Sequence, residues 1–359
     1  MAVTEQEVLG ALSAVMDPDL HRDIVSLGFV QTVAIDGGRV SFTIELTTPA
    51  CPVRDQLKHQ AEAVVRELPG VESVDVEMTA QVAGARRGGP MIPGVKHVIA
   101  VASGKGGVGK STVSCNLAVA LSMTGARVGL LDSDIYGPTV PLMMGAADDE
   151  PEMDGESLLP IRRYGVDIMS IGFFMEPDRA VVWRGPMVGK ALNQFLQDVR
   201  WGDLDYLIVD LPPGTGDAPM SLSQLIPITG VVIVMTPQDV AARIANKAIL
   251  MFRQLSEATE HEIPILGIVE NMSGYVCPHC GKEGPLFGSG GGATSAAALN
   301  VPLLGRVPID AEICDSGDAG MPAVLAAPDT IQAEAFRKIA GQVAARVSAL
   351  TVAVQGPDV

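Results

Sequence analysis

The stretch from Val98 to Met123, VIAVASGKGGVGKSTVSCNLAVALSM, decides the fold of this 359-residue chain. Its apolar beginning predicts a buried strand, and its end from Val113 predicts a helix. The loop between them has the form G-x-x-x-x-G-K-[ST], in which backbone N–H groups and a helix N-terminus bind phosphate. The alternative is a glycine-rich turn without a ligand. We predict a loop that binds Mg-ATP through Gly104, Lys105, Gly106, Gly107, Val108, Gly109, Lys110, Ser111 and Thr112.

Two residues of this loop have defined chemical roles in such a site. Lys110 is expected to neutralise the β- and γ-phosphates, and the hydroxyl of Ser111 is expected to bind Mg²⁺. Both therefore enter the predicted nucleotide site, Lys110 as a catalytic residue and Ser111 as a metal ligand.

Apolar strands alternate with helices from His97 onward. This alternation predicts an α/β domain with a mostly parallel sheet and helices on both faces. The expected strands are Val98–Ala102, Val128–Leu131, Val166–Ile171, Tyr206–Val209, Gly230–Met235, Ile265–Val269 and Leu303–Val307, and a helix from Ile331 to about Leu350 closes the domain.

The first 80 residues predict a separate small α+β domain of order αββαβ. A hairpin is expected at Asp36-Gly37-Gly38, and a helix is expected after Cys51-Pro52. The boundaries we predict are 1–80 for this domain, 81–96 for a Gly- and Pro-rich linker, 97–350 for the P-loop domain and 351–359 for a tail.

Composition excludes several classes of protein. No apolar run approaches the roughly 18 residues of a membrane-spanning helix, and the N-terminus lacks the features of a secretory signal. We therefore expect a soluble, cytoplasmic protein. The net charge of −17 makes nucleic acid an unfavourable partner. Five cysteines without an export signal indicate metal binding or thiolate chemistry rather than disulfides.

Acidic residues follow two of the expected strands, at the sheet edge where ligands of open α/β sheets bind. Asp210, in the sequence LIVDLPPGTGD, is the candidate that holds Mg²⁺ directly or through water. Asp134 is expected to position the attacking water, with Asp132 behind it, and Gly214 to contact the γ-phosphate through its N–H. Each acid can alternatively be an ordinary loop or capping residue, as can Asp217.

A second constellation is the sequence CPHCG, in which Cys277 and Cys280 form a C-x-x-C pair. Zinc sites and [4Fe–4S] clusters normally need four thiolates. One such pair supplies two, and a symmetric dimer supplies four. The alternatives are zinc in place of a cluster, and a thioredoxin-like redox pair. His279 is expected to be a spacer.

The other three cysteines have separate interpretations. Cys51 precedes a predicted helix with Pro52 at its first position, where the helix dipole lowers a thiol pKa. This favours a reactive thiolate, and a buried structural cysteine is the alternative. Cys115 is expected to lie in the core, and Cys314 is expected to be structural.

The loop GKGGVGKS resembles the deviant Walker A motif of MinD, ParA, the arsenite-pump ATPases and nitrogenase reductase, because it has a second lysine, Lys105. The resemblance implies that Lys105 reaches a partner's nucleotide in a homodimer; the alternative is a solvated lysine. It also implies that Asn271 contacts adenine.

The motifs GKGGVGKST, DSDIYGPT, DLPPGTGD, ENMSGYVCPHCG and VPID together resemble the Mrp/ApbC family of iron–sulfur cluster carriers. The segments DPDLHRDIVSLG and TTPACP resemble an iron–sulfur assembly domain often fused in front of them. The resemblance implies a homodimer that shares a labile [4Fe–4S] cluster between Cys277 and Cys280 of each chain, passes it to apo-proteins and hydrolyses ATP slowly. Cluster-assembly scaffolds are further candidate partners. Ser133, between the two acids of DSD, departs mildly from the family pattern.

Three rival interpretations share the loop. A MinD- or ParA-like positioning ATPase needs no C-x-x-C, and a nitrogenase-reductase-like electron donor has widely separated cysteine ligands. A zinc-stapled dimeric regulatory ATPase without cluster transfer is the strongest rival of a different class.

Overall fold

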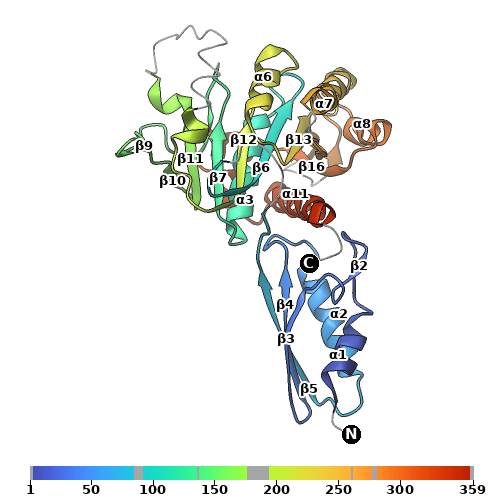
Figure 1. Ribbon diagram of the computed structural model, residues 1–359. Coiled ribbons are helices and arrows are strands. Elements are labelled where there is room, and N and C mark those ends of the chain that lie inside the picture. Colours follow the sequence, from blue (N-terminus) through green and yellow to red (C-terminus); the bar gives the residue numbers. More distant parts are fainter. Residues whose placement is uncertain are drawn as a thin grey trace. The chain divides into compact units, whose positions relative to one another are not determined.

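The computed structural model (Figure 1) describes residues 3–84, 92–135, 137–175, 194–259, 262–276, 280 and 282–355. The chain divides into two compact units. The first comprises Met1–Ala83 with Ala344–Val359, and the second comprises Gly84–Val343. Helix α11 (Ile331–Gln355) contributes to both units and continues past Leu350, where the sequence suggested that it ends.

The first unit has the predicted αββαβ order. Its elements are α1 (Glu5–Leu12), β3 (Val30–Asp36), β4 (Arg39–Leu46), α2 (Arg54–Arg66) and β5 (Ser73–Ala80), with a short antiparallel pair of β1 (Met16–Asp17) and β2 (Arg22–Asp23). Strands β3 and β4 form the expected hairpin, with Asp36 opposite Arg39. Strand β5 pairs parallel to β4, so α2 is the crossover between them.

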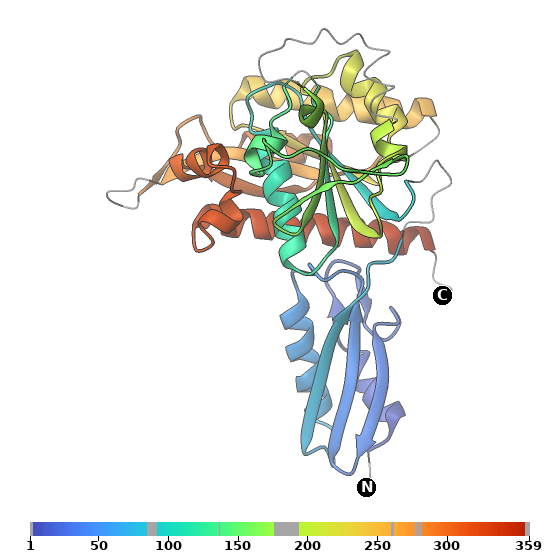
Figure 2. The same cartoon turned by 90° about the vertical axis from the view of Figure 1, so that its left-hand side faces the viewer.

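One face of this three-stranded sheet carries both helices (Figure 1). The helices bury Val8 and Leu12 of α1 and Leu57, Ala61 and Val65 of α2, at the spacing of one helical face. Alternate residues of β4 from Val40 to Leu46 are buried with them. The unit therefore has a hydrophobic core of its own. Figure 2 shows the sheet and the helices of this unit after a turn of 90°.

The second unit contains a mostly parallel sheet, as the sequence predicts. Among the described residues it has nine strands in the order β10-β11-β7-β12-β6-β13-β14-β15, with β16 also paired to β14. The strands are β6 (Val95–Ser103), β7 (Val128–Asp132), β10 (Ile161–Arg163), β11 (Val166–Ser170), β12 (Leu204–Asp210), β13 (Gly230–Met235), β14 (Ile265–Val276), β15 (Glu283–Gly284) and β16 (Leu303–Ile309). Of these nine described strands, only β10 and β15 pair antiparallel to their neighbours in the sheet. A small hairpin of β8 (Met153–Asp154) and β9 (Ser157–Leu158) stands apart.

Helices connect these strands. They are α3 (Lys110–Met123), α4 (Val140–Met143), the 3-10 helix η1 (Ile171–Phe174), α6 (Asp217–Leu225), α7 (Asp239–Thr259), α8 (Gly291–Leu299), α9 (Ala311–Asp318) and α10 (Ala323–Ala326), and residues 194–197 are also helical.

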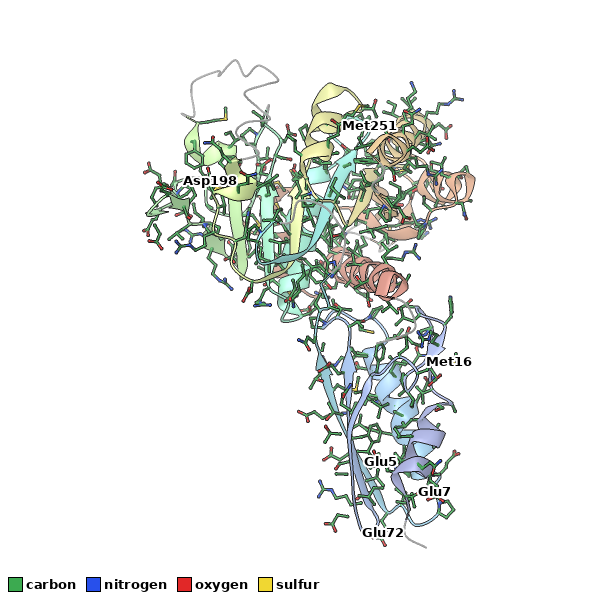
Figure 3. All side chains as sticks on the ribbon, viewed as in Figure 1. Glu5, Glu7, Met16, Glu72, Asp198 and Met251 are labelled. Carbon is green, nitrogen blue, oxygen red and sulfur yellow. The ribbon has the colours of Figure 1, made fainter. Side chains whose placement is uncertain are left out.

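Both faces of the sheet are covered. On β6, Val98, Ala100 and Ala102 share a core cluster with apolar residues of α7, including Met251, which Figure 3 labels. Ile99 and Val101, which alternate with them, are fully buried on the opposite face. Burial on both sides explains why these strands are continuous apolar runs.

The parallel strands bring three functional segments to one edge. Strand β6 ends at Ser103, immediately before the glycine-rich loop, and β7 and β12 end at Asp132 and Asp210. Asp210 pairs in register with Asp132 on one side and with Val101 on the other. The loop and both aspartates therefore lie at the carboxyl ends of adjacent strands.

Candidate functional site

The glycine-rich loop joins β6 to α3. Gly109 is the N-cap of α3, with φ 79°, and Gly107 has φ 78°, which are left-handed conformations that glycine adopts without strain. Among the residues that the structure describes, no side chain caps the first turn of α3. Its N–H groups are therefore directed to a ligand or to solvent rather than to the protein, which fits an anion such as phosphate.

Two neighbouring elements hold this loop tightly. A Cβ atom at Gly104 would lie 2.5 Å from the carbonyl oxygen of Ile244 in α7. A Cβ atom at Gly109 would lie 2.2 Å from Nδ2 of Asn271 in β14. The glycines thus permit both the curl of the loop and its close packing against α7 and β14.

The carboxylate of Asp210 is the centre of the site. It is fully buried, and Lys110 Nζ donates to its Oδ2 at 2.7 Å. The Ser111 hydroxyl donates to the same oxygen at 2.6 Å, and Ser114 Oγ lies 2.6 Å from Oδ1. Asp134 is also close, with Oδ2 3.8 Å from Lys110 Nζ. The structure therefore gathers Lys110, Ser111, Asp134 and Asp210.

These atoms fit Mg²⁺ bound to a nucleotide. A carboxylate and a hydroxyl that lie within 2.6 Å of each other are hard oxygen ligands, which Mg²⁺ prefers. The Lys110 ammonium, 6% exposed, supplies the adjacent positive charge for phosphate oxygens. Among the described residues, no group of three or more His, Cys, Asp and Glu side chains is placed to hold a metal ion by itself.

Asp132 holds the segment after β7. Its Oδ1 accepts from the N–H of Asp134 at 3.1 Å, and its Oδ2 accepts from the Ser170 hydroxyl at 3.0 Å and from the N–H of Val140 at 3.3 Å. Burial, together with the nearby charge of Asp210, raises the pKa of Asp132 to about 7. In this structure Asp132 holds the backbone of Asp134 through this hydrogen bond, and its role behind the attacking water stays a prediction.

Ser133 connects the ends of β7 and β12. Its N–H and its hydroxyl both donate to the carbonyl oxygen of Asp210, at 3.0 and 2.7 Å. The hydroxyl of Ser133 therefore adds a contact between the two strands that carry the acids.

Gly214 lies close to the loop, but its N–H is already engaged. It donates to the carbonyl oxygen of Ser103 at 2.8 Å, with φ 103° at Gly214. A contact to a γ-phosphate through this N–H requires that bond to open. Asp217 begins α6, and its side chain lies outside the described residues.

The remaining residues of the loop surround it. Val108 is buried, and Gly106 and Gly107 are exposed. The side chains of Lys105 and Thr112 are half-buried. Within the described residues, the Lys105 ammonium has no ion-pair partner. The carbonyl oxygen of Lys105 accepts from the Ser103 hydroxyl at 3.0 Å.

Asn271 lies beside the loop on β14. Its side chain is 6% exposed, and its Nδ2 donates to the carbonyl oxygen of Val108 at 2.9 Å. The structure thus places Asn271 at the nucleotide site, in contact with the loop itself.

The C-x-x-C pair is described only in part. Strand β14 ends at Val276, and Cys277 and His279 lie outside the described residues. Cys280 is described and exposed.

The expectation for Cys51 is wrong. Helix α2 begins at Arg54 with Val53 as its N-cap, so Pro52 is not its first residue, and a backbone hydrogen bond from Val53 lowers the thiol pKa by less than burial raises it. Burial raises the pKa of the Cys51 thiol to about 11. Cys51 is thus a protonated, half-buried thiol in this structure rather than a helix-activated thiolate.

The other two cysteines differ from each other. Cys115 is fully buried in α3, as predicted, and burial raises its pKa well above the ordinary value. Cys314, expected to be structural, is instead exposed on α9, with Sγ 4.0 Å from Oδ2 of Asp318.

Two serines of the site were not predicted. Ser114 holds Asp210, and Ser170 holds Asp132. Ser114 lies four residues after Lys110 on α3 and therefore shares its helical face, which is the signal that identifies it. Ser170 is the last residue of β11, whose register opposite Asp132 is known only from the sheet.

A glycine loop between strand and helix, a buried lysine and serine, and an aspartate at the end of the adjacent strand define a P-loop nucleotide-binding protein. Comparison with known proteins is consistent with this class. The model of the NUBPL iron-transfer P-loop NTPase matches residues 94–344, and the model of the iron–sulfur cluster assembly protein matches residues 5–77. The chain belongs to the family of iron-transfer P-loop NTPases, which confirms the resemblance found in the sequence.

Several relatives are similar over nearly the whole chain. The iron–sulfur cluster carrier protein of Synechocystis sp. is 47% identical over 353 residues, which cover 96% of this chain and 98% of the relative. The protein of the same name from Escherichia coli K12 is 42% identical, covering 95% and 91%.

Solved structures resemble the second unit. A nucleotide-binding protein from Archaeoglobus fulgidus in complex with ADP is 37% identical, with a TM-score of 0.59, covering 68% of this chain and 93% of that one. The cell-division ATPase MinD of Pyrococcus furiosus, 23% identical with a TM-score of 0.51, shares the fold. No helix in the described part of the chain is long and apolar enough to cross a membrane.

Proposed function

We propose that this protein binds iron–sulfur clusters and transfers them to apo-proteins, and that it binds ATP and hydrolyses it slowly. The observation that carries the proposal is that strand β14 runs from the phosphate loop to the C-x-x-C pair. This strand supports the phosphate loop through Asn271 and leads directly to Cys277 of the C-x-x-C pair. One strand thus joins the nucleotide site to the candidate cluster ligands.

The residues of the nucleotide site have distinct proposed roles. Lys110 leaves its ion pair with Asp210 and binds the β- and γ-phosphates. Asp210 and Ser111 hold Mg²⁺, which neutralises phosphate charge when it is bound. Asp134, 3.8 Å from the Lys110 ammonium, positions the attacking water.

The γ-phosphate has two proposed sensors. Gly214 exchanges its bond to Ser103 for a phosphate oxygen, which changes the segment before α6. Lys105, whose ammonium is unpaired among the described residues, contacts the nucleotide of a second copy of the chain. Both changes depend on the presence of the γ-phosphate, so the cluster site can respond to the state of the nucleotide.

The cluster is proposed to lie between two copies of the chain. Cys277 and Cys280 supply two thiolates per chain, and a [4Fe–4S] cluster takes four. A homodimer with the two pairs on its two-fold axis satisfies this number. The names and identities of the carrier-protein relatives support the cluster as cargo.

The first unit is proposed to be an iron–sulfur assembly domain that docks recipients or scaffold proteins. Its match to the assembly-protein model over residues 5–77 supports this. We propose residues 1–80 as this domain, 81–96 as a linker, 97–350 as the carrier domain and 351–359 as a tail, and the cytoplasm as the location. The high pKa of Cys51 argues that the unit acts as a docking domain rather than through a free thiolate.

Anaerobic reconstitution with iron and sulfide tests the proposal. The wild-type protein is expected to become brown, to hold about four irons per dimer and to activate a recipient apo-enzyme that needs [4Fe–4S]. Cys277→Ser and Cys280→Ser should each abolish retention. Cys314→Ser, a matched change of an exposed thiol, should not. A colourless dimer that holds one zinc and transfers nothing would overturn the proposal.

A further inference from the structure

Asn271 is oriented by the phosphate loop. Its side chain is 6% exposed, and one end of its carboxamide lies 2.9 Å from the carbonyl oxygen of Val108. A carbonyl oxygen only accepts hydrogen bonds, so the end that faces it must be the NH₂ group. The orientation of this amide is therefore determined by its partner.

The loop is shaped to receive this amide. A Cβ atom at Gly109 would lie 2.2 Å from Asn271 Nδ2, so any side chain at position 109 displaces it. Gly109 is also the N-cap of α3 and adopts φ 79°. Asn271 thus contacts the two residues that immediately precede Lys110.

Asn271 is held on a rigid base. The preceding residue, Glu270, is fully buried and accepts hydrogen bonds from the Ser273 hydroxyl and from the N–H of Gly292 at the beginning of α8. Arg306 Nε of β16 lies 3.5 Å from its Oε1. The position of Asn271 is thereby fixed by two neighbouring elements, and displacement of β14 must disturb the loop.

We propose that Asn271 is a positioning residue of the phosphate loop, which it supports through its NH₂ group whatever base the nucleotide carries. This inference goes beyond contact with adenine, and it deepens the proposed function because β14 leads from Asn271 to Cys277. The strand transmits the geometry of the occupied loop to the residues before the thiolates.

The experiment compares three ligands that differ in their base. Binding of Mg-ATP, Mg-GTP and Mg-tripolyphosphate, which has no base, is measured by calorimetry for wild type and Asn271→Ala. The proposal expects a loss of about five- to tenfold for all three, the size of one hydrogen bond. A loss confined to ATP would overturn it, because that is the result for a residue that only reads adenine.

A double-variant cycle separates support of the loop from general destabilisation. Gly109→Ala should weaken tripolyphosphate binding in the wild-type background, and at least about threefold less in the Asn271→Ala background, where the amide that it displaces is missing. Strictly additive losses would overturn the proposal. Gln332→Ala, which removes another buried amide whose Nε2 donates to Oδ2 of Asp310 at 2.9 Å, is the control and should leave tripolyphosphate binding within about twofold.

Cluster measurements distinguish failure of this inference from failure of the proposed function. Asn271→Ala is expected to load a cluster like the wild type but to lose the effect of Mg-ATP on transfer. If the wild type loads no cluster, the carrier function fails, and the tripolyphosphate result still decides the role of Asn271. If transfer from Asn271→Ala keeps the full effect of Mg-ATP at saturating nucleotide, the link through β14 is refuted.

Discussion

Ser114→Ala removes one of the three side-chain groups that hold the buried carboxylate of Asp210. Both residues are fully buried, and Ser114 Oγ lies 2.6 Å from Asp210 Oδ1. A hydrogen bond to a charged group contributes about 1.5–3 kcal/mol, and serine and alanine differ little in volume. We therefore expect the free energy of unfolding of the second unit to fall by about 2 kcal/mol in the absence of nucleotide. For a unit of this size the Tm should fall by about 4–8 °C.

Tryptophan fluorescence during urea unfolding measures this change in the correct unit. Both tryptophans, Trp183 and Trp201, belong to the second unit. Ser122→Ala on the same helix is the control, because its hydroxyl makes an exposed, neutral bond to the carbonyl oxygen of Gly165 at 3.0 Å. It should cost under about 1 kcal/mol. If Ser114→Ala is no more destabilising than Ser122→Ala, the carboxylate is not held as described.

Three further predictions concern other parts of the chain. Because the pKa of Cys51 is raised to about 11, its thiolate fraction at pH 8 is about a hundredfold below that of an ordinary thiol. Mass spectrometry after iodoacetamide treatment should find it alkylated far more slowly than exposed Cys314, and equal rates would contradict the assignment. Asp132 keeps its proton in the folded state up to about pH 7, whereas the unfolded chain loses it near pH 4. Stability should therefore fall as the pH rises between these values, and Asp132→Asn should flatten this slope in urea titrations at several pH values; an unchanged slope would show that Asp132 does not cause it. Gly104→Ala places a Cβ atom 2.5 Å from the carbonyl oxygen of Ile244 and should lower the free energy of unfolding by about 1–3 kcal/mol in the same assay. A variant as stable as the wild type would contradict this close packing.

Much of the fold follows from local pattern. The predicted strands from Val98–Ala102 to Leu303–Val307 all occur, because strands buried on both faces must be continuous apolar runs. The loop from Gly104 to Ser111 was equally predictable, since that spacing of glycine, lysine and serine between a strand and a helix is specific for a P-loop phosphate site. Asp210 followed from its place at a strand end.

The remainder depends on tertiary contacts that spacing does not reveal. The sequence around Cys51 suggested activation by a helix end, but the helix begins at Arg54 and burial dominates the pKa. The N–H of Gly214 looked available, yet the chain after β12 brings it to the carbonyl oxygen of Ser103. The contact of Asn271 with adenine stays a prediction, and only the packing of β14 against the loop places its NH₂ group on the carbonyl oxygen of Val108.

We propose above all that the nucleotide bound at the phosphate loop controls the transfer of the iron–sulfur cluster held by the cysteine pair. The direct test is the rate at which reconstituted protein activates a recipient apo-enzyme, with and without Mg-ATP, for wild type and for Lys110→Ala. We predict that Mg-ATP changes the rate for the wild type and leaves the rate of Lys110→Ala at its nucleotide-free value, while both proteins hold the same amount of iron. Transfer by the wild type at one rate in both conditions, or no transfer at all, would contradict the account.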